Sequence, residues 1–401
     1  MRVLLSTYGT RGDVEPLVAL AVRLRELGAE VRMCAPPDEE FAQRLAGLGV
    51  RLMPVGPPVR ALMSGTTLPS AADLSRYRTE MLDAQFEIFP GALDGCDVMV
   101  VAGLAQIAAR SVAEAAGVRY VYTSYSAVNL PSPYHAPPPR PGWPEPEAHD
   151  NPTLWELDAD SVNAQFAEPL NGHRAVLGLP PVDNVRDHVL TNRPWLAADP
   201  VLGPWRETPG LDVVQTGAWT LPDERPLPAD LMAFLDAGAP PVYVGFGSIR
   251  PSPDIARRAV EAIHAEGRRV LVSRGWADLD LGDDRDDCLA IGEVSHQSLF
   301  GKVAAVVHHG GAGTTLTAAR AGAPQVVVPL PLADNPYWAS QVAELDLGAA
   351  LDSPNPTTES LTVAFKTVLA PETQARAREL GGRIRSDGAA VAAKLLVDSI
   401  R

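Results

Sequence analysis

Short apolar runs of strand length alternate with helical patterns from the first residues of the chain. RVLLST (2–7) is followed by the loop YGTRGD, by the helical pattern VEPLVALAVRLRELGAE and by a second run, VRMCAP (31–36). The alternation continues through DVMVVAGL and VRYVYTSY. Because strands joined by helical crossovers pair in parallel, the pattern predicts a parallel α/β sheet in the N-terminal part.

A second series of the same kind fills the C-terminal part. Its strand candidates are PPVYVGFGSI, RRVLVSR, AAVVHHG and APQVVVPL. Helical patterns such as DIARRAVEAIHAEG and TTLTAARAGA separate these strands. We therefore predict that the second half of the chain repeats the architecture of the first.

The length and the loops suggest two domains. A chain of 401 residues is long for one hydrophobic core and normal for two domains of roughly 200 residues each. Residues 201–228 are rich in proline and glycine, which is typical of an interdomain linker. We predict an N-terminal domain over 1–200 and a C-terminal domain over 229–385. Residues 386–401 have the pattern of an amphipathic helix, which packs either on its own domain or on the first one.

Composition excludes several classes of protein. The net charge of -15 disfavours nucleic acid as a partner, which needs a concentrated basic face. Cys34, Cys96 and Cys288 are odd in number and far apart, so we expect buried thiols rather than disulfides or a zinc site. Neither a signal peptide nor an apolar run of about 20 residues is recognisable, so we expect a cytoplasmic protein with no membrane partner.

The segment HHGGAGTT (308–315) follows a strand candidate and precedes a helical pattern, which is the order of an anion-binding turn. Glycines let the backbone approach an oxygen closely, the threonines add hydroxyl donors, and the second histidine adds a donor or, if protonated, a charge. The segment lacks the GK[ST] of ATPases and the GxGxxG of dinucleotide enzymes. Considered alone, such a glycine turn is more often plain backbone geometry than a ligand site, and a lone histidine is more often structural. The candidate residues are His309, Gly311, Gly313, Thr314 and Thr315.

Further candidates lie at other predicted strand ends on the same edge of the second sheet. Ser248 follows the glycine turn in VGFGSI, and Trp276 in SRGWADL either stacks on a base or covers the sheet. Asp334 and Asn335 precede a helical pattern, where short polar side chains either cap the helix or bind sugar hydroxyls.

In the first domain, Asp13 follows the earliest strand at the start of a helix. Its carboxylate either caps that helix or accepts a proton from a substrate hydroxyl, and spacing alone favours the cap. The proline-rich segment 131–152 excludes a helix or central strand, and its aromatic residues favour a functional surface loop.

Several of these segments together resemble one known family. STYGTRGDVEPLVALAVRLRELGAEV and VAAVVHHGGAGTTLTAARAGAPQVVVPLPLADNPYWASQVAELDLG are similar to family-one glycosyltransferases of the GT-B fold. GLPPVDNVRD, PWLAADPVLGP and VVQTGAWTLPDERPLP more narrowly resemble the actinomycete enzymes that glycosylate vancomycin-type and teicoplanin-type heptapeptide aglycones. The resemblance, which runs nearly end to end, implies two Rossmann-like parallel-sheet domains facing a cleft. It also implies that the first domain binds the acceptor and the second the nucleotide-sugar donor.

The resemblance also implies roles for the candidate residues. Asp13 matches the catalytic base. The diphosphate site is matched by His309, Gly311, Gly313, Thr314 and Thr315 of the turn, together with Ser248. Trp276, Val294 and Gln297 match nucleotide-contacting positions. Asp334 and Asn335 lie where glucosyltransferases often carry an Asp-Gln pair that binds the donor sugar, so the shorter Asn leaves the sugar open. Acceptor contacts are expected from Thr10, Tyr134 and His135.

The function that this family implies is an inverting transfer of glucose, or a close hexose, from a UDP-sugar to a phenolic hydroxyl of the aglycone. The central hydroxyphenylglycine is the expected acceptor, and neither a metal nor a further cofactor is expected. Two alternatives stay open: a TDP-deoxyaminosugar transferase on the same scaffold, and a catalytically silent nucleotide-binding partner protein. A UDP-sugar epimerase lacks support, because a second acid-base constellation is not apparent.

Overall fold

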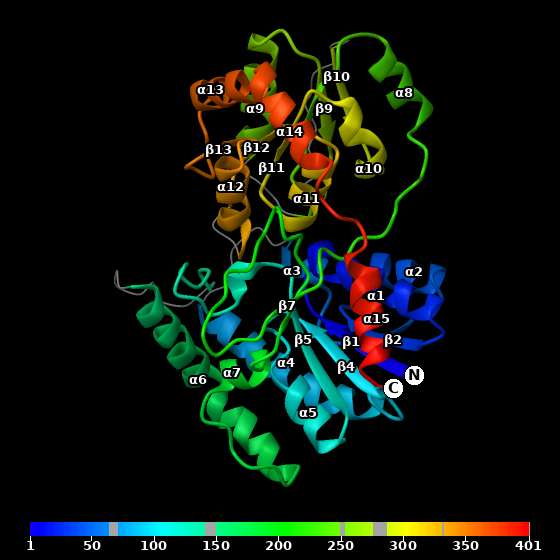
Figure 1. The fold of residues 1–401 in the computed structure, drawn as a ribbon, viewed down its shortest axis with the longest axis vertical. Helices are drawn as coiled ribbons and strands as arrows, with labels where there is room; N and C mark the ends of the chain where they lie inside the picture. Colours follow the sequence, from blue (N-terminus) through cyan, green and yellow to red (C-terminus); the bar gives the residue numbers. More distant parts are fainter. Residues whose placement is uncertain (64–70, 141–149, 249–252, 276–286, 331–332, 401) are drawn as a thin grey trace. The chain divides into compact units, whose positions relative to one another are not determined.

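A computed structural model describes residues 1–63, 71–140, 150–248, 253–275, 287–330 and 333–400. The chain forms two compact units, coloured by sequence in Figure 1. Unit 1 consists of Met1–Leu221 with Arg385–Arg401, and unit 2 of Pro222–Ile384. The boundary therefore lies within the segment 201–228 that we predicted as a linker, and its first 21 residues belong to unit 1.

Unit 1 is built on a parallel sheet of seven strands among the described residues, in the order β3-β2-β1-β4-β5-β6-β7. The strands are β1 (Arg2–Thr7), β2 (Glu30–Ala35), β3 (Arg51–Pro54), β4 (Val98–Ala102), β5 (Arg119–Ser124), β6 (Trp195–Leu196) and β7 (Val214–Gln215). The chain runs outward from β1 to β3 and then returns to place β4 on the other side of β1. Ligands of open α/β sheets bind at such a switch point, beyond the carboxyl ends of the strands.

Helices cover both faces of this sheet (Figure 1). They are α1 (Arg11–Glu26), α2 (Glu39–Gly47), α3 (Val59–Met63), α4 (Ala71–Ala92), α5 (Ala109–Ala115), α6 (Asn151–Val176), α7 (Val185–Leu190) and α15 (Gly388–Asp398). Side chains of a strand alternate between the faces. Val3 and Leu5 of β1 thus pack in the cluster shared with α1 and α15, whereas Leu4 packs in the cluster shared with α4 and α6.

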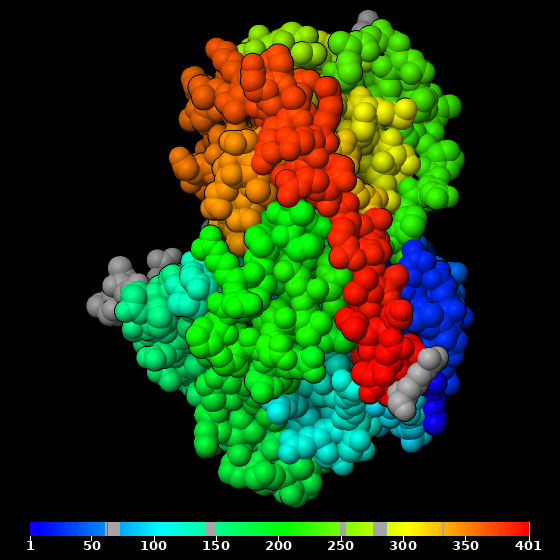
Figure 2. Space-filling view, viewed as in Figure 1, coloured from blue at the N-terminus to red at the C-terminus, as the bar shows by residue number. Residues whose placement is uncertain are grey.

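The C-terminal helix α15 belongs to unit 1 and packs on α1. In Figures 1 and 2 it is the red helix beside the blue N-terminal elements. The backbone N–H of Arg385 donates to the buried carboxylate of Asp199 at 3.0 Å. A Cβ at Gly388 would lie 2.4 Å from the carbonyl carbon of Gly217, so only glycine allows the helix to begin this close to that loop. These two contacts fix the end of the chain on unit 1.

Unit 2 repeats the architecture, as the sequence predicted. Its described sheet has six parallel strands in the order β10-β9-β8-β11-β12-β13. They are β8 (Val242–Val244), β9 (Val270–Ser273), β10 (Cys288–Ile291), β11 (Ala305–His308), β12 (Gln325–Val327) and β13 (Gly348–Ala350). The helices are α8 (Ala229–Asp236), α9 (Pro253–Ala265), α10 (His296–Leu299), α11 (Ala312–Arg320), α12 (Asn335–Glu344), α13 (Thr358–Val368) and α14 (Pro371–Gly381). The switch point of this sheet lies between β8 and β11.

The cysteines differ in one respect from the expectation. Cys34 and Cys96 are buried free thiols, as predicted, but Cys288 is only half-buried. It lies on β10, which among the described residues is the edge strand of the second sheet and pairs with β9. Helices long and apolar enough to span a membrane are absent from the part of the chain that the structure describes.

Candidate active site

Asp13 lies in the first turn of α1, at the carboxyl end of β1. The helix begins at Arg11, three residues earlier than we predicted, with Thr10 at the N-cap position. The backbone N–H of Thr10 donates to Asp13 Oδ2 at 2.8 Å, and the Tyr125 hydroxyl donates to the Asp13 backbone carbonyl at 2.9 Å. The carboxylate therefore does cap the helix. Because a carboxylate has about four acceptor positions and Asp13 is half-buried, the cap does not exclude a second role as a base.

Gly9 determines where this carboxylate can lie. A Cβ added at Gly9 would lie 2.1 Å from Asp13 Oδ2 and 2.3 Å from Asp13 Cγ. Any side chain at position 9 would thus displace the Asp13 carboxylate from the Thr10 N–H. Gly9 was not among the candidate residues predicted from the sequence.

Other polar groups at the same sheet edge were also missed. The Tyr8 hydroxyl donates to the Pro57 carbonyl at 2.8 Å, and burial raises the pKa of Tyr8 to about 12. Ser6 donates to Gln106 Oε1 at 2.5 Å, and both side chains are fully buried. Within the described residues, Gln106 Nε2 and Ser126 Oγ are buried without a hydrogen-bond partner. The available signal was their position at, or within a few residues of, the carboxyl ends of β1, β4 and β5.

The described part of the proline-rich loop, residues 131–140, contains two predicted acceptor residues, and one of them, Tyr134, is exposed to solvent. Tyr134 is 53% exposed, and the Arg206 guanidinium lies over its ring at 5.4 Å. His135 instead packs edge-on against Trp155, whose indole N–H donates to the His135 carbonyl at 2.9 Å. Burial lowers the pKa of His135. Tyr134 is therefore the side chain of this pair that faces solvent.

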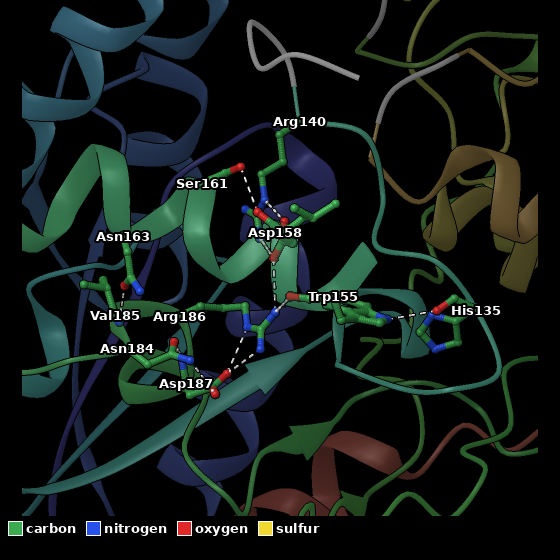
Figure 3. Close-up of polar contacts among 11 residues, drawn as sticks. His135, Arg140, Trp155, Asp158, Ser161, Asn163, Asn184, Val185, Arg186 and Asp187 are labelled. Atoms are coloured by element: carbon green, nitrogen blue, oxygen red, sulfur yellow. Dashed lines mark hydrogen bonds and ion pairs between the residues drawn. The ribbon is translucent and has the colours of Figure 1, made fainter. Parts of the chain in front are cut away.

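A buried ion-pair cluster holds this loop to helices α6 and α7 (Figure 3). Arg140 forms two hydrogen bonds with Asp158, one of them at 2.9 Å, and Arg186 lies 3.6 Å from the same carboxylate. Arg186 also donates to the Trp155 carbonyl and lies over the Trp155 ring at 5.5 Å. We call these four residues the Asp158 clamp. It fixes the position of Arg140, the last described residue of this part of the loop.

In unit 2, the HHGGAGTT turn leads from β11 into α11, as the sequence predicted. Gly310 has a φ of +92°, which favours glycine, and Gly311 is the N-cap of a helix that begins at Ala312. First-turn N–H groups of a helix have no acceptor within the helix, and the helix dipole adds positive potential there. This end of α11 therefore has the backbone geometry of an anion site.

His309 is buried beside two glycine turns. A Cβ at Gly311 would lie 2.6 Å from His309 Nε2, and one at Gly247 would lie 3.6 Å from His309 Cε1. The structure thus brings the VGFGSI turn, with half-buried Ser248, to the HHGGAGTT turn. Burial lowers the pKa of His309 to about 4, so its ring is neutral near pH 7 and carries no charge. In the described part of the chain, His309 Nδ1 has no partner.

The two threonines differ in what they offer. Thr315 is fully buried, and its hydroxyl donates to the Gly311 carbonyl at 2.9 Å. In this structure the Thr315 hydroxyl therefore donates within the turn itself, and its predicted contact with a ligand stays a prediction. Thr314 is half-buried and Gly313 is exposed, with open space where its Cβ would be. The accessible part of the turn therefore consists of Gly313 and half-buried Thr314.

Asp334 and Asn335 begin helix α12 beside this turn. Asp334 occupies the N-cap position without a capping hydrogen bond, and Asp334 Oδ2 accepts the Trp338 indole N–H at 2.7 Å. Burial raises the pKa of Asp334. Asn335 is 5% exposed, and its Nδ2 is without a partner among the described residues. A Cβ at Gly310 would lie 2.8 Å from the Asn335 carbonyl oxygen, so α12 begins in contact with the turn.

Of the three predicted nucleotide-contacting residues, the structure describes Gln297 and Val294, and both contact other parts of unit 2. Gln297 Oε1 accepts hydrogen bonds from Arg320 at 2.9 Å and from the Asp223 N–H at 3.3 Å. Val294 is half-buried against the core of unit 2. Trp276 lies outside the described residues. Clusters of three or more His, Cys, Asp or Glu side chains able to hold a metal are absent from the described ranges.

Comparisons with known proteins decide the family. Residues 3–129 match the glycosyltransferase family 28 N-terminal domain, and residues 283–393 match the erythromycin biosynthesis protein CIII-like C-terminal domain. Glycosyltransferase GtfE of Amycolatopsis orientalis is 56% identical, and the alignment covers 100% of this chain and 98% of that protein. Vancomycin aglycone glucosyltransferase of the same organism is 55% identical with the same coverage. The chain belongs to the glycosyltransferases of glycopeptide antibiotic biosynthesis.

Solved structures show that this glycosyltransferase has the GT-B fold. A glycosyltransferase of kitacinnamycin matches with a TM-score of 0.75 and 19% identity, over 100% of this chain and 99% of that one. VinC, solved in complex with dTDP, matches with a TM-score of 0.73 and 22% identity over the same shares. The predicted family, enzyme class and fold are therefore confirmed.

Proposed function

We propose that this glycosyltransferase transfers glucose from UDP-glucose, with inversion and without a metal ion, to a phenolic hydroxyl of a glycopeptide aglycone. The central hydroxyphenylglycine is the proposed acceptor. The observation that carries the proposal is the 55% identity over the full chain to an enzyme named vancomycin aglycone glucosyltransferase. The geometry of Asp13 and of the glycine turn supports the chemistry.

Asp13 is the proposed general base. Its carboxylate is held by the Thr10 N–H, and its backbone by the Tyr125 hydroxyl, so the group is fixed but half-accessible. A phenol has a pKa of about 10, which is far lower than that of an aliphatic alcohol, so a carboxylate is an adequate base. As the proton leaves, the phenolic oxygen attacks the anomeric carbon opposite the diphosphate. One displacement of this kind inverts the configuration.

The turn of unit 2 is the proposed site for the leaving diphosphate. Negative charge grows on the diphosphate as the sugar leaves, and N–H groups at the start of α11 stabilise it. Neutral His309 adds a hydrogen bond, and Thr314 adds a hydroxyl. These donors would supply the stabilisation for which other transferases use a divalent cation, which is why we propose metal independence.

A TDP-aminosugar donor is the second candidate. dTDP-epi-vancosaminyltransferase of Amycolatopsis orientalis is 49% identical, with 100% of this chain covered. The observation that favours this candidate is the buried Asn335. Glucosyltransferases often carry an Asp-Gln pair at the positions of Asp334 and Asn335, and asparagine is shorter than that glutamine. The two candidates differ in the donor and share the roles of Asp13 and the turn.

A donor and acceptor panel separates these possibilities. The protein is incubated with vancomycin-type and teicoplanin-type aglycones, their glucosylated forms and a set of UDP- and dTDP-sugars, with and without EDTA, and product masses are read. The proposal predicts one added hexose from UDP-glucose on an aglycone, unchanged by EDTA. Transfer of an aminosugar alone would support the second candidate. Nucleotide binding without any transfer would instead indicate a catalytically silent protein and contradict both.

A further inference from the structure

We propose that His308, a residue outside the expected donor contacts, is a positioning residue that sets the geometry of the diphosphate turn. Its buried imidazole holds the Gly310 N–H and is itself held by Gln325. The inference rests on the proposed function only for the identity of the ligand at the turn. The arrangement of the three residues is a property of the protein alone.

The two hydrogen bonds of His308 are compatible with only one tautomer of its neutral ring. The Gly310 backbone N–H lies 3.1 Å from His308 Nδ1, and His308 Nε2 lies 2.8 Å from Gln325 Oε1. A backbone N–H can only donate, so Nδ1 must be unprotonated and accept. The neutral ring then carries its proton on Nε2 and donates it to the Gln325 oxygen. Both ring nitrogens are thus used, and the ring plane is fixed.

Gly310, which His308 holds, has a positive φ and is closely surrounded by its neighbours. Gly310 has a φ of +92°, and the position of its missing Cβ lies 2.8 Å from the Asn335 carbonyl oxygen and 3.1 Å from Val327 Cγ1. The turn is therefore packed between the end of β12 and the start of α12. The Gly310 N–H would be a buried donor without a partner if His308 did not accept from it.

Gln325 fixes the orientation of the His308 ring through the hydrogen bond to Nε2. It lies on β12, a central strand, and is fully buried beside Val326 and Val327. A polar side chain inside an apolar parallel strand needs a partner, and here the partner is the Nε2–H of His308. The Gln325–His308–Gly310 chain thus links β12 to the turn. We infer that it orients the N–H groups of Gly311 and of the first turn of α11 toward the ligand.

Three measurements on the full chain test this positioning role. Nitrogen NMR of histidine-labelled protein reports which ring nitrogen of His308 is protonated, with His308→Asn identifying the resonance. Calorimetry with UDP and dTDP reports nucleotide affinity. Steady-state kinetics separates the donor KM from the acceptor KM and kcat.

His308→Phe keeps a ring of similar size without an acceptor, whereas His308→Asn places an amide oxygen close to the position of Nδ1. We expect His308→Phe to weaken UDP binding and raise the donor KM by about tenfold or more, with the acceptor KM unchanged. His308→Asn should remain within about threefold of the unmodified protein, since it still accepts from Gly310. Leu361→Ala, in the core of unit 2, is the control: it should lower the melting temperature without changing UDP affinity.

Two results would overturn the inference: a proton on Nδ1 of His308, or His308→Phe binding UDP as tightly as the unmodified protein. If His308→Phe does not fold, the NMR result on the unmodified protein decides. Failure to glycosylate any aglycone would count against the proposed function alone, because nucleotide affinity and the tautomer are measured without an acceptor.

Discussion

At the scale of single residues, Asp13 combines a structural role with a proposed catalytic one. Its carboxylate accepts the Thr10 N–H, and an amide oxygen at the same position can accept that bond too. Asp13→Asn should therefore change the free energy of unfolding by less than about 1 kcal/mol. Because an amide is not a base, kcat should fall about 100- to 10,000-fold. Kinetics and UDP calorimetry check this, and an unchanged kcat would leave Asp13 with the cap alone.

Gly9 is predicted to be essential for the position of Asp13. In Gly9→Ala, the new Cβ would collide with the Asp13 carboxylate, which must move away. Since misplacement of a catalytic group by about 1 Å can cost two orders of magnitude, we expect kcat to fall by about tenfold to a hundredfold, with donor affinity preserved. Gly12→Ala is the matched control, because its Cβ would meet nothing closer than Thr10 Oγ1 at 3.8 Å. Equal losses in both variants would contradict the account.

The low pKa of His309 predicts a pH dependence of stability. In the unfolded chain, histidine takes up a proton near pH 6.5, whereas folded His309 does so near pH 4. Between these values the unfolded state binds more protons, so stability is lost as the pH falls. His309 should account for about 2 kcal/mol of loss between pH 7 and pH 5. Denaturation of His309→Gln should show a shallower pH dependence, and equal slopes would show that His309 does not contribute.

At the scale of elements, the Asp158 clamp determines how the acceptor loop meets α6 and α7. Asp158 is 7% exposed and faces both Arg140 and Arg186. Removing its charge takes this carboxylate away from half-buried Arg140 and from buried Arg186, which keeps its ion pair with Asp187 at 2.8 Å. Asp158→Asn should therefore lower the free energy of unfolding by about 3–5 kcal/mol. It should also raise the acceptor KM, because residues 131–140 lose one of their attachments to α6, while the donor KM stays the same.

The chain offers a matched control for this change. Arg193 and Asp212 form an ion pair at 3.0 Å whose side chains are 67% and 75% exposed. Solvent screens such a pair, so Asp212→Asn should cost less than about 1 kcal/mol and leave the acceptor KM unchanged. Denaturant titration and acceptor kinetics of both variants check this. If Asp158→Asn behaved like Asp212→Asn, the clamp would have no role in holding the loop.

The whole molecule repeats one architecture twice, and the sequence predicted this because buried parallel strands are continuous apolar runs. β1, β4, β8 and β11 were all recognisable for that reason. β6 and β7 were not, since two residues carry no periodic pattern. β7 therefore lies in a segment that its proline and glycine content had marked as a linker.

The site was predictable where its signal is local. Asp13 and the HHGGAGTT turn each lie where a strand leads into a helix, so the sequence pattern was sufficient to place them at the carboxyl ends of strands. Their roles in binding and catalysis stay predictions. Contacts between distant segments were not predictable: Tyr125 is 112 residues from Asp13, and His308 is 17 residues from Gln325. The same holds for Gly9, whose role depends on the exact path of the turn before α1.

The central claim, inverting transfer to a phenolic hydroxyl, is tested most directly by the configuration of the product. UDP-glucose and an aglycone are incubated with the enzyme, and the product is isolated and examined by NMR for the linkage position and the anomeric configuration. Because UDP-glucose is an α-glycoside, a single displacement assisted by Asp13 predicts a β-glucoside on a phenolic oxygen. An α-glucoside, a sugar on a non-phenolic atom or the absence of product would contradict the account.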